Sequence, residues 1–294
     1  MPQQYISFIR TIAKNSHKAI VIIMSKDLRI SIAIFIGASL LYIALCMALW
    51  FYWDVFGLLI ALSILFGILT AVVAYTFRLS QTGVRQLTKN IEALFSIDQV
   101  LDISFPLPNF GGYRISHQLA KRLIATVLEY QPKTIVELGC GTSTVVLSYA
   151  LKHLGRGKIL SIEHCENFAN NTRHSLALHH LSESATVHVA NLHNIVIDGS
   201  SWHWYDIDRV QNLPERIDLL FVDGPPAKTQ KLARYPALSQ FLPRLSENAV
   251  VILDDAYRSD EIQIAKRWIH ENPEFKLEID SDTGCAFLFR NQSR

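Results

Sequence analysis

Residues 136–144 read Val-Glu-Leu-Gly-Cys-Gly-Thr-Ser-Thr, an apolar run that passes directly into a glycine-rich turn. The run predicts a buried strand, and the two glycines let the backbone turn tightly and approach a ligand. The N–H groups at the start of the helix that follows are free to bind a polar or anionic group. A dinucleotide-binding fingerprint has a third glycine where this chain has Thr144. Glu137, two residues before the first glycine, favours instead a ligand that carries a cationic amine.

Short apolar runs alternate with helix-like stretches through the C-terminal part of the chain. The first five runs are nearly continuous in Val, Ile, Leu and Phe, which is typical of strands buried on both faces of a parallel sheet. The last two are separated by residues 280–284, a turn sequence that predicts an antiparallel hairpin. The alternation predicts a doubly wound α/β fold. The predicted strands are Thr134–Leu138, Lys158–Glu163, Ala185–Val189, Ile217–Val222, Ala249–Leu253, Phe275–Ile279 and Cys285–Arg290.

The residues that follow these strands are the candidates for chemistry, because ligands of such folds bind beyond the carboxyl ends of the strands. Glu163 ends the second run, where an acid can accept both hydroxyls of a ribose. Asn191 follows the third run, and its amide can bond an adenine edge. The fourth and fifth runs are followed by Asp223 and by the pair Asp254-Asp255. Each acid alone is equally explained as a loop solubiliser or a helix cap, but acids or glycines at four strand ends indicate a site.

The glycine turn with its preceding acid, Glu163 and the sequence Val222-Asp223-Gly224-Pro225-Pro226 together resemble the class I S-adenosylmethionine-dependent methyltransferases, over roughly residues 111–294. The resemblance implies a Rossmann-like seven-stranded methyltransferase sheet whose last strand is antiparallel. It also implies that Glu137 lies near the amino group of the methionine part and that Glu163 holds the ribose. The cofactor-binding residues predicted for S-adenosylmethionine are Glu137, Gly139, Gly141, Thr142, Ser143, Glu163, Asn191 and Asp223.

Asp223 with the pair Asp254-Asp255 is similar to the metal site of the metal-dependent small-molecule O-methyltransferases. In those enzymes an acid after the fourth strand and an acidic or amide pair after the fifth hold a divalent cation. Carboxylates are hard oxygen ligands suited to Mg²⁺, and such a cation lowers the pKa of a substrate hydroxyl and orients it for attack. This chain departs from the pattern at Asp255, where an Asn often completes the site. A helix cap before Asp260, or a simple border of the pocket, is the alternative for the pair.

The predicted catalytic residues are Asp223 and Lys228. Lys228 qualifies as a general base if burial and a nearby cation lower its pKa, and a solvated loop lysine is the alternative. Arg234 and Tyr235 either position an acidic or sugar-like acceptor or simply precede a helix. Three aromatic residues between the third and fourth strands form either an acceptor wall or a hydrophobic plug: Trp202, Trp204 and Tyr205.

Residues 30–77 contain a single charged side chain, Asp54, whereas the whole chain is 18% charged. Two apolar runs in this segment, residues 30–50 and 55–77, are each long enough to cross the hydrocarbon core as a helix. The aromatic join at residues 50–54 predicts a tight turn at one interface. We therefore predict a two-helix transmembrane hairpin. A signal peptide, or a buried helical hairpin of a soluble protein, explains the paired runs less well.

Basic residues flank the hairpin on both sides, with five Lys or Arg against one Asp in residues 1–29 and with Arg78, Arg85 and Lys89 beyond its second run. The positive-inside rule therefore places both ends in the cytoplasm and the chain in the inner (cytoplasmic) membrane. The four cysteines show no metal-ligand spacing, which fits reduced thiols. The predicted domains are a basic segment (1–29), the hairpin (30–77), a connecting helix and loop (78–110) and the methyltransferase domain (111–294).

These features predict an S-adenosylmethionine-dependent O-methyltransferase with Mg²⁺ as a second cofactor. It would act on a small-molecule, glycan or lipid-linked acceptor at the cytoplasmic membrane face. The near balance of 28 Lys and Arg against 26 Asp and Glu excludes a strongly basic nucleic-acid binder. A non-catalytic membrane-tethered nucleotide-binding module is the alternative, which the intact glycine turn and Glu163 disfavour. Thr144 disfavours a dinucleotide oxidoreductase.

Overall fold

A computed structural model describes residues 3–108, 110 and 115–290, without the side chains of residues 3–33, 49 and 52–54. The chain divides into two compact units, Met1–Val84 and Arg85–Arg294. The side chains of the predicted basic segment, residues 1–29, lie outside the described part. The predicted start of the methyltransferase domain at residue 111 lies outside it as well.

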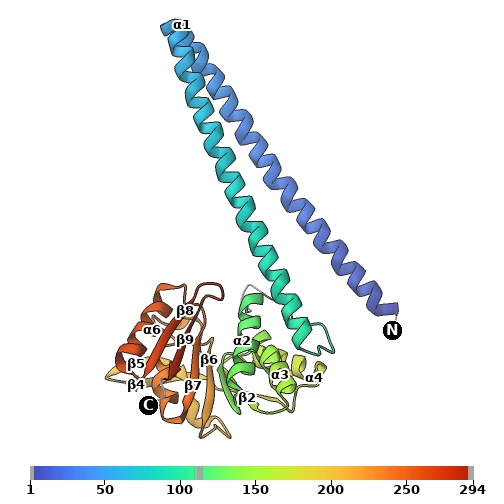
Figure 1. The fold of residues 1–294 in the computed structure, drawn as a ribbon, viewed down its shortest axis with the longest axis vertical. Helices are drawn as coiled ribbons and strands as arrows, with labels where there is room; N and C mark the ends of the chain where they lie inside the picture. Colours follow the sequence, from blue (N-terminus) through green and yellow to red (C-terminus); the bar gives the residue numbers. More distant parts are fainter. Residues whose placement is uncertain (1–2, 109, 111–114, 291–294) are drawn as a thin grey trace. The chain divides into compact units, whose positions relative to one another are not determined.

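The first unit is helical, and helix α1 (Gln3–Val100) runs through it and continues into the second unit. Among the described residues, one helix is long and apolar enough to cross a membrane, Val55–Val100, and Ile34–Ala48 is a shorter apolar helix. The residues of the predicted tight turn, 50–54, keep helical geometry within α1. No Pro or Gly occurs there to interrupt the helical hydrogen bonds. Figure 1 shows the helical chain bending back on itself within this unit.

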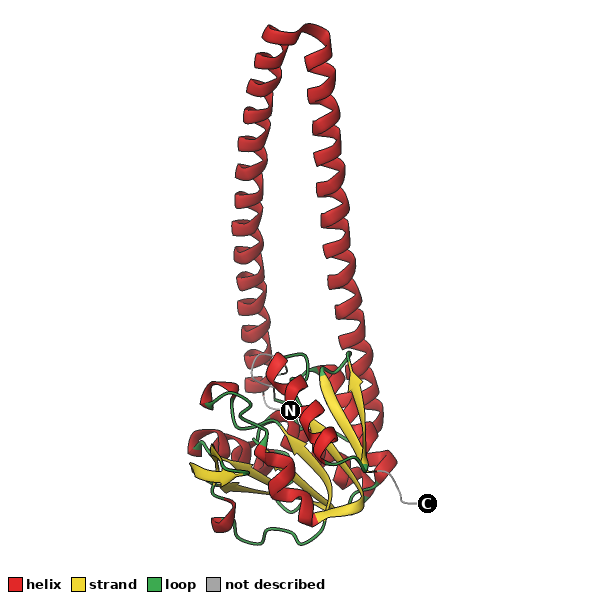
Figure 2. Ribbon diagram, turned by 90° about the vertical axis from the view of Figure 1, so that its left-hand side faces the viewer, coloured by secondary structure: helices red, strands yellow, loops and turns green. Residues whose placement is uncertain are grey.

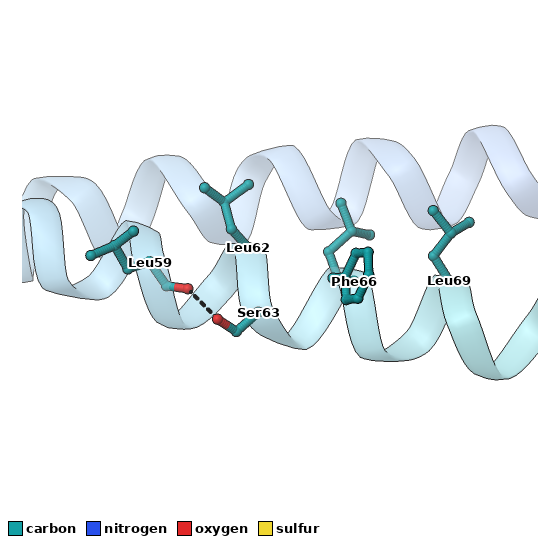
Figure 3. A pocket seen from close by; sticks show the side chains of 6 residues that line it. Leu59, Leu62, Ser63, Phe66 and Leu69 are labelled. Carbon is teal, nitrogen blue, oxygen red and sulfur yellow. Dashed lines mark hydrogen bonds between the residues drawn. The ribbon is translucent and has the colours of Figure 1, made fainter.

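The described side chains of the first unit are mostly apolar and exposed. Figure 3 shows one apolar face of α1, lined by Leu59, Leu62, Phe66 and Leu69. Ser63 lies on the same face and donates its hydroxyl hydrogen bond to the carbonyl of Leu59 at 2.9 Å. Its polar group is thereby satisfied within the helix, without water. The same kind of bond to a carbonyl of α1 is made by Ser39, Thr70, Thr76 and Thr82.

The second unit contains a seven-stranded sheet with the order β3-β2-β1-β6-β7-β9-β8. The first five strands in this order are parallel, and β9 is antiparallel to both β7 and β8. This confirms the predicted seven-stranded Rossmann-like sheet with an antiparallel last strand. Strand β7 begins at Leu245 rather than at the predicted residue 249. The strands are β1 (Thr134–Leu138), β2 (Lys158–Glu163), β3 (Ala185–Val189), β6 (Ile217–Val222), β7 (Leu245–Leu253), β8 (Phe275–Asp280) and β9 (Cys285–Arg290).

Helices flank the sheet (Figure 2), and each face of the sheet has its own buried core. In β1, Ile135 belongs to the core under α2, α3 and α4, and Val136 belongs to the core under α5 and α6. Helix α2 begins after Ser116, whose hydroxyl accepts the N–H of Leu119 at 3.1 Å and caps the helix. The helices are α2 (His117–Tyr130), α3 (Thr142–Leu154), α4 (Glu166–Leu178), α5 (Pro236–Phe241) and α6 (Ser259–Glu271), with short 3-10 helices η1 (Ile207–Arg209), η2 (Ala227–Thr229) and η3 (Leu242–Arg244).

A separate antiparallel pair, β4 (Leu192–Ile197) with β5 (Ser200–Tyr205), lies between β3 and β6 in the chain. The sequence analysis assigns no strand here, although an Asp-Gly pair at 198–199 and the alternation of exposed and buried residues in β5 are typical of a hairpin. Trp202, Trp204 and Tyr205 are all buried. Their burial favours the hydrophobic plug over the acceptor wall.

Candidate active site

Four parallel strands end at one edge of the sheet, and backbone hydrogen bonds continue their pairing beyond the last strand residues. The N–H of Asp223 donates to the carbonyl of Leu138 at 2.8 Å, and the N–H of Asp254 donates to that of Val222 at 3.0 Å. A third bond of this kind joins the residue after β1 to β2. The ends of β1, β2, β6 and β7 therefore bring the glycine turn and the predicted acids to the same edge.

Two glycines allow the turns after β1 and β6 to pack against each other. Gly139 has a φ angle of +93°, and a Cβ there would lie 3.3 Å from the carbonyl carbon and oxygen of Asp223. A Cβ on Gly224 would lie 2.2 Å from the phenol oxygen of Tyr205. Larger residues would therefore force the two turns apart.

Glu137 is fully buried at the end of β1, where hydroxyl groups hold its carboxylate. Thr144 Oγ1 donates to Oε2 at 2.6 Å, and Ser161 Oγ donates to the same oxygen. The Oε1 atom is buried without a hydrogen-bond partner among the described residues. Burial raises the pKa of Glu137 to about 7, although the hydroxyl groups of Ser143, Ser161 and Thr144 oppose this rise. Glu137 thus fixes the first turn of α3 and keeps one oxygen open to a donor.

Glu163 ends β2 and is 5% exposed. Its Oε2 accepts the N–H of Cys140 at 3.2 Å, and its Oε1 accepts the N–H of Cys165 at 2.8 Å. The Nδ1 atom of His164 lies 2.8 Å from the same Oε1. The bond from Cys140 ties the carboxylate to the glycine turn. Since a carboxylate has about four acceptor positions, Glu163 keeps capacity for further donors.

The remaining predicted cofactor residues lie on either side of this pair. Thr142 and Ser143 are buried in the first turn of α3. The N–H of Gly141 donates to Thr144 Oγ1 at 3.0 Å, which closes the turn. Asn191 is exposed directly after β3. The glycine turn therefore lies in contact with Glu137 and Glu163. Asn191 lies at the same edge of the sheet.

Asp223, Asp254 and Asp255 follow β6 and β7, and one carboxylate oxygen of each lies within 4.8 Å of the others. Arg234, which is 3% exposed, lies among them. Its Nη2 donates to Oδ1 of Asp223 and to Oδ2 of Asp255, both at 3.0 Å. Its Nη1 donates to the backbone carbonyl of Asp254 at 2.9 Å. These bonds direct the guanidinium to the protein's own acids rather than to an acceptor.

These three acids do not fit a bound divalent cation as they stand. Their oxygens suit Mg²⁺ by chemistry, but Arg234 already donates to one oxygen of two of the three acids, so such an ion would have to bind beside a guanidinium. A second guanidinium, that of Arg258, lies 2.8 Å from Oδ2 of Asp255. Burial and then Asp254 raise the pKa of Asp223, and Arg234 opposes this rise. The cluster therefore already contains cations of the protein itself.

Two other predicted residues lie away from this cluster. Lys228 is exposed on η2, so the structure lacks the burial on which its predicted role as a base depends. Tyr235 is buried, and its hydroxyl donates to both carboxylate oxygens of Glu271 at 3.0 and 2.9 Å. The guanidinium of Arg267 lies 3.8 Å from the centre of its ring. Tyr235 is therefore part of the core beside α6.

The sequence predicts Tyr205 as part of an acceptor wall or of a hydrophobic plug, but it does not predict a role for the hydroxyl. Its hydroxyl is buried without a hydrogen-bond partner among the described residues, beside Gly224. Burial raises its pKa well above the ordinary value, and the charge of Glu163 adds to the rise. An unsatisfied buried hydroxyl at this edge is a donor available to a ligand. Its place at the end of an alternating strand is the sequence signal that identifies it.

Residues 136–256 match a protein family described as a methyltransferase domain. No curated protein matches the chain.

Among solved structures, the chain is similar to the SAH-bound methyltransferase PaMTH1 of Podospora anserina, with 14% identity and a TM-score of 0.48 over 62% of this chain and 81% of that chain. It is similar to the O-methyltransferase TomG of Streptomyces achromogenes, involved in tomaymycin synthesis and in complex with SAM, with 18% identity and a TM-score of 0.45 over 70% and 89% of the two chains. The O-methyltransferase of Bacillus cereus in complex with SAH has 19% identity and a TM-score of 0.46, over 69% and 91%.

Proposed function

We propose a function from the premise that residues 136–256 are a class I methyltransferase domain: the chain transfers the methyl group of S-adenosylmethionine to a hydroxyl oxygen of a small-molecule, glycan or lipid-linked acceptor. One observation carries the proposal. Two buried carboxylates, Glu137 and Glu163, are joined to the same glycine turn and keep unused acceptor positions.

The residues at this edge fit S-adenosylmethionine. The buried Oε1 of Glu137 lacks a partner, and the cationic amine of the methionine part supplies one. Glu163 has acceptor positions for two ribose hydroxyls. The first turn of α3, with Thr142 and Ser143, offers backbone N–H groups to the carboxylate of the methionine part. Asn191 and the Tyr205 hydroxyl remain for the edge of the adenine and for other polar atoms of the ligand.

The bound cofactor supplies an electrophilic methyl group on a sulfonium. The acceptor hydroxyl loses its proton, its oxygen forms the new bond to the methyl carbon, and the bond from that carbon to sulfur breaks. Asp223 accepts the proton, because burial raises the pKa of its carboxyl above the ordinary value and so makes the carboxylate a stronger base. Arg234 holds Oδ1 of Asp223 at 3.0 Å and so fixes the orientation of this carboxylate.

Magnesium and Lys228 remain sequence-based predictions, and neither takes part in the proposed step. The exposed position of Lys228 favours Asp223 as the base. A cation at Asp223, Asp254 and Asp255 would have to compete with Arg234.

We also propose that residues 30–50 and 55–77 anchor the enzyme in the inner membrane as a hairpin, with the domain from about residue 111 in the cytoplasm. The exposed apolar side chains of α1, such as Phe66 at 72%, support contact with lipid. Hydroxyl groups that bond within the helix, such as that of Ser63, support it as well, because no water is present in the bilayer core.

Reporter fusions test the anchor. A reporter that is active only in the cytoplasm, fused after residue 294, is expected to be active, and a periplasmic reporter at the same position is expected to be silent. The reverse result contradicts the proposed orientation. Extraction of the chain from membranes by carbonate contradicts the anchor itself.

The function is tested with the full chain purified in detergent. We expect stoichiometric binding of S-adenosylhomocysteine by isothermal titration, and transfer of labelled methyl groups from S-adenosylmethionine into lipid or glycan extracts. Mass spectrometry of the labelled product identifies the acceptor and the methylated atom. Binding without transfer to any extract supports a non-catalytic tethered module, and binding of NADH in place of S-adenosylhomocysteine supports an oxidoreductase.

A further inference from the structure

Arg234 is the most deeply buried cation at the edge where the acids gather, within the part of the chain that the structure describes. Its two terminal nitrogens make four hydrogen bonds, to one oxygen each of the Asp223 and Asp255 carboxylates and to the backbone carbonyls of Asp223 and Asp254. The carboxylates of Asp223 and Asp255 thus share one internal guanidinium, which also bonds the backbone of Asp254. The planar fork of an arginine suits such multiple bonding better than a lysine does.

The surrounding chain fixes Arg234 in this position. Tyr235, its neighbour, is buried and packs its ring on Trp202 with centroids 4.8 Å apart. The N–H of Leu232 donates to Oδ2 of Asp260 at 3.1 Å, and α5 begins at Pro236. An arginine held on both sides cannot swing out of the cluster without moving core residues.

A guanidinium and a divalent cation both bind carboxylates, so they would compete for this group of acids. A metal ion needs the carboxylate oxygens that lie within 4.8 Å of one another, and Arg234 already donates to two of these acids. Two positive groups close together repel each other, most strongly where the surroundings are buried, so the guanidinium of Arg234 disfavours a metal ion beside it.

We propose that Arg234 is the resident cation of this cluster, in the place where related enzymes hold a divalent metal. It is a positioning residue: it holds Asp223 and the turn after β7 without itself touching the substrate. Methyl transfer then proceeds without bound magnesium, a consequence that rests on the proposed function. The departure from the metal-site pattern at Asp255 agrees with the proposal, because a third acid is a partner for a guanidinium.

Metal binding is measured directly on the full chain, in the absence of any cofactor. Titration with Mn²⁺ followed by electron paramagnetic resonance, and with Mg²⁺ by calorimetry, is expected to show no saturable binding to the wild-type chain. Saturable binding that Asp255→Asn abolishes would overturn the proposal. Because no methyl transfer enters this measurement, its failure is distinct from a failure of the proposed function.

The gain-of-binding variant is Arg234→Met, which removes the guanidinium and keeps a long side chain. We expect it to bind Mn²⁺ saturably, and the double variant with Asp254→Asn to lose that binding. Arg258→Met is the matched control, because Arg258 forms its ion pair with Asp255 alone among the three acids and is 40% exposed; the variant is expected to bind no Mn²⁺. A folded Arg234→Met chain that binds no Mn²⁺ overturns the proposal.

If Arg234→Met does not fold, Mn²⁺ titrations of Arg234→Lys and of the wild-type chain test the proposal instead. The lysine keeps the charge but bonds at a single point, so weak Mn²⁺ binding at the freed acid supports the competition. Turnover of the wild-type chain is expected to be unchanged after EDTA treatment. A loss of turnover that Mg²⁺ restores would contradict a resident arginine.

Discussion

The two halves of the site edge neutralise buried acids in different ways. At the ends of β1 and β2, Glu137 and Glu163 are held by hydroxyl and backbone N–H groups, which carry no charge. At the ends of β6 and β7, Asp223 and Asp255 are held by the guanidinium of Arg234. Neutral donors bring no positive charge to the carboxylates and leave spare lone pairs, so the first half attracts a cationic, hydroxyl-rich ligand. The second half already contains a buried guanidinium, which suits it to orient a base rather than to recruit a cation.

The largest expected effect comes from removing the internal cation. Arg234→Met leaves the carboxylates of Asp223 and Asp255 without their shared guanidinium, and breaking a buried ion pair typically costs about 3–5 kcal/mol. We expect the free energy of unfolding of the second unit to fall by about that amount in denaturant titrations followed by tryptophan fluorescence.

The matched control for this stability measurement is Arg258→Met. Arg258 is 40% exposed and bonds the same Asp255, so its removal is expected to cost less than about 1 kcal/mol. Equal losses for the two arginines would remove the contrast between a buried internal cation and a surface ion pair.

The next effect concerns the chemistry of the second half. Asp223→Asn keeps the shape of the side chain but removes the proposed base, so we expect turnover to fall by about 100-fold to 10,000-fold, the usual contribution of a general base. The affinity for S-adenosylhomocysteine is expected to change little. Steady-state rates and isothermal titration measure the two quantities separately.

Asp218→Asn is the control on the same strand. Asp218 lies at the opposite end of β6 and accepts the N–H groups of Lys133 and Thr134 at 2.9 and 3.2 Å. It is expected to affect stability but not turnover per folded molecule. If Asp223→Asn loses cofactor affinity together with turnover, Asp223 serves the cofactor and not the proton transfer.

The halves also differ in how far their sequence predicts them. The first half is encoded locally: the apolar run, the glycines and Glu137 are contiguous, and Glu163 ends the next run. Parallel strands end at a common edge, so co-location of these residues follows from the strand pattern alone. The helix cap at Ser116 is equally local and equally predictable.

The second half depends on loop paths that no periodicity encodes. Arg234 reaches acids 11 and 21 residues away because of turns at Leu232 and Asp255, both with positive φ angles. Non-glycine residues rarely adopt such angles, so a sequence reading does not anticipate them. The role of Tyr205 is hard to predict for a related reason, since the position of the β4–β5 hairpin brings its hydroxyl beside Gly224.

A smaller effect is expected when the first half loses its ribose partner. Glu163→Ala removes an acceptor from the proposed ribose site and strands the N–H groups of Cys140 and Cys165. Loss of a polar partner of this kind costs about 1–3 kcal/mol, so affinity for S-adenosylhomocysteine is expected to fall by roughly 5-fold to 150-fold. Isothermal titration measures it, with Glu166→Ala as the control because Glu166 is exposed in the first turn of α4. Unchanged affinity would place the ribose elsewhere.

The smallest effect is a pH dependence of cofactor affinity that belongs to the first half alone. The pKa of Glu137 in the ligand-free protein is raised to about 7, chiefly by burial. A cationic amine beside the carboxylate favours its ionised form, so binding below about pH 7 must release a proton. At pH 8 the group is already ionised and binding releases none. We therefore expect affinity for S-adenosylhomocysteine to be about tenfold weaker at pH 6 than at pH 8, since one pKa unit corresponds to a factor of ten.

Glu137→Gln separates this ionisation from every other titration. The amide keeps an acceptor for the Thr144 and Ser161 hydroxyls but cannot ionise, so its affinity is expected to be lower at pH 8 and flat between pH 6 and pH 8. Titrations in two buffers of different ionisation enthalpy count the protons released by the wild-type chain at pH 6. If the variant keeps the wild-type slope, another group carries the proton and the amine does not lie beside Glu137. The distinction between a half that recruits a cation and a half that contains one would then be lost.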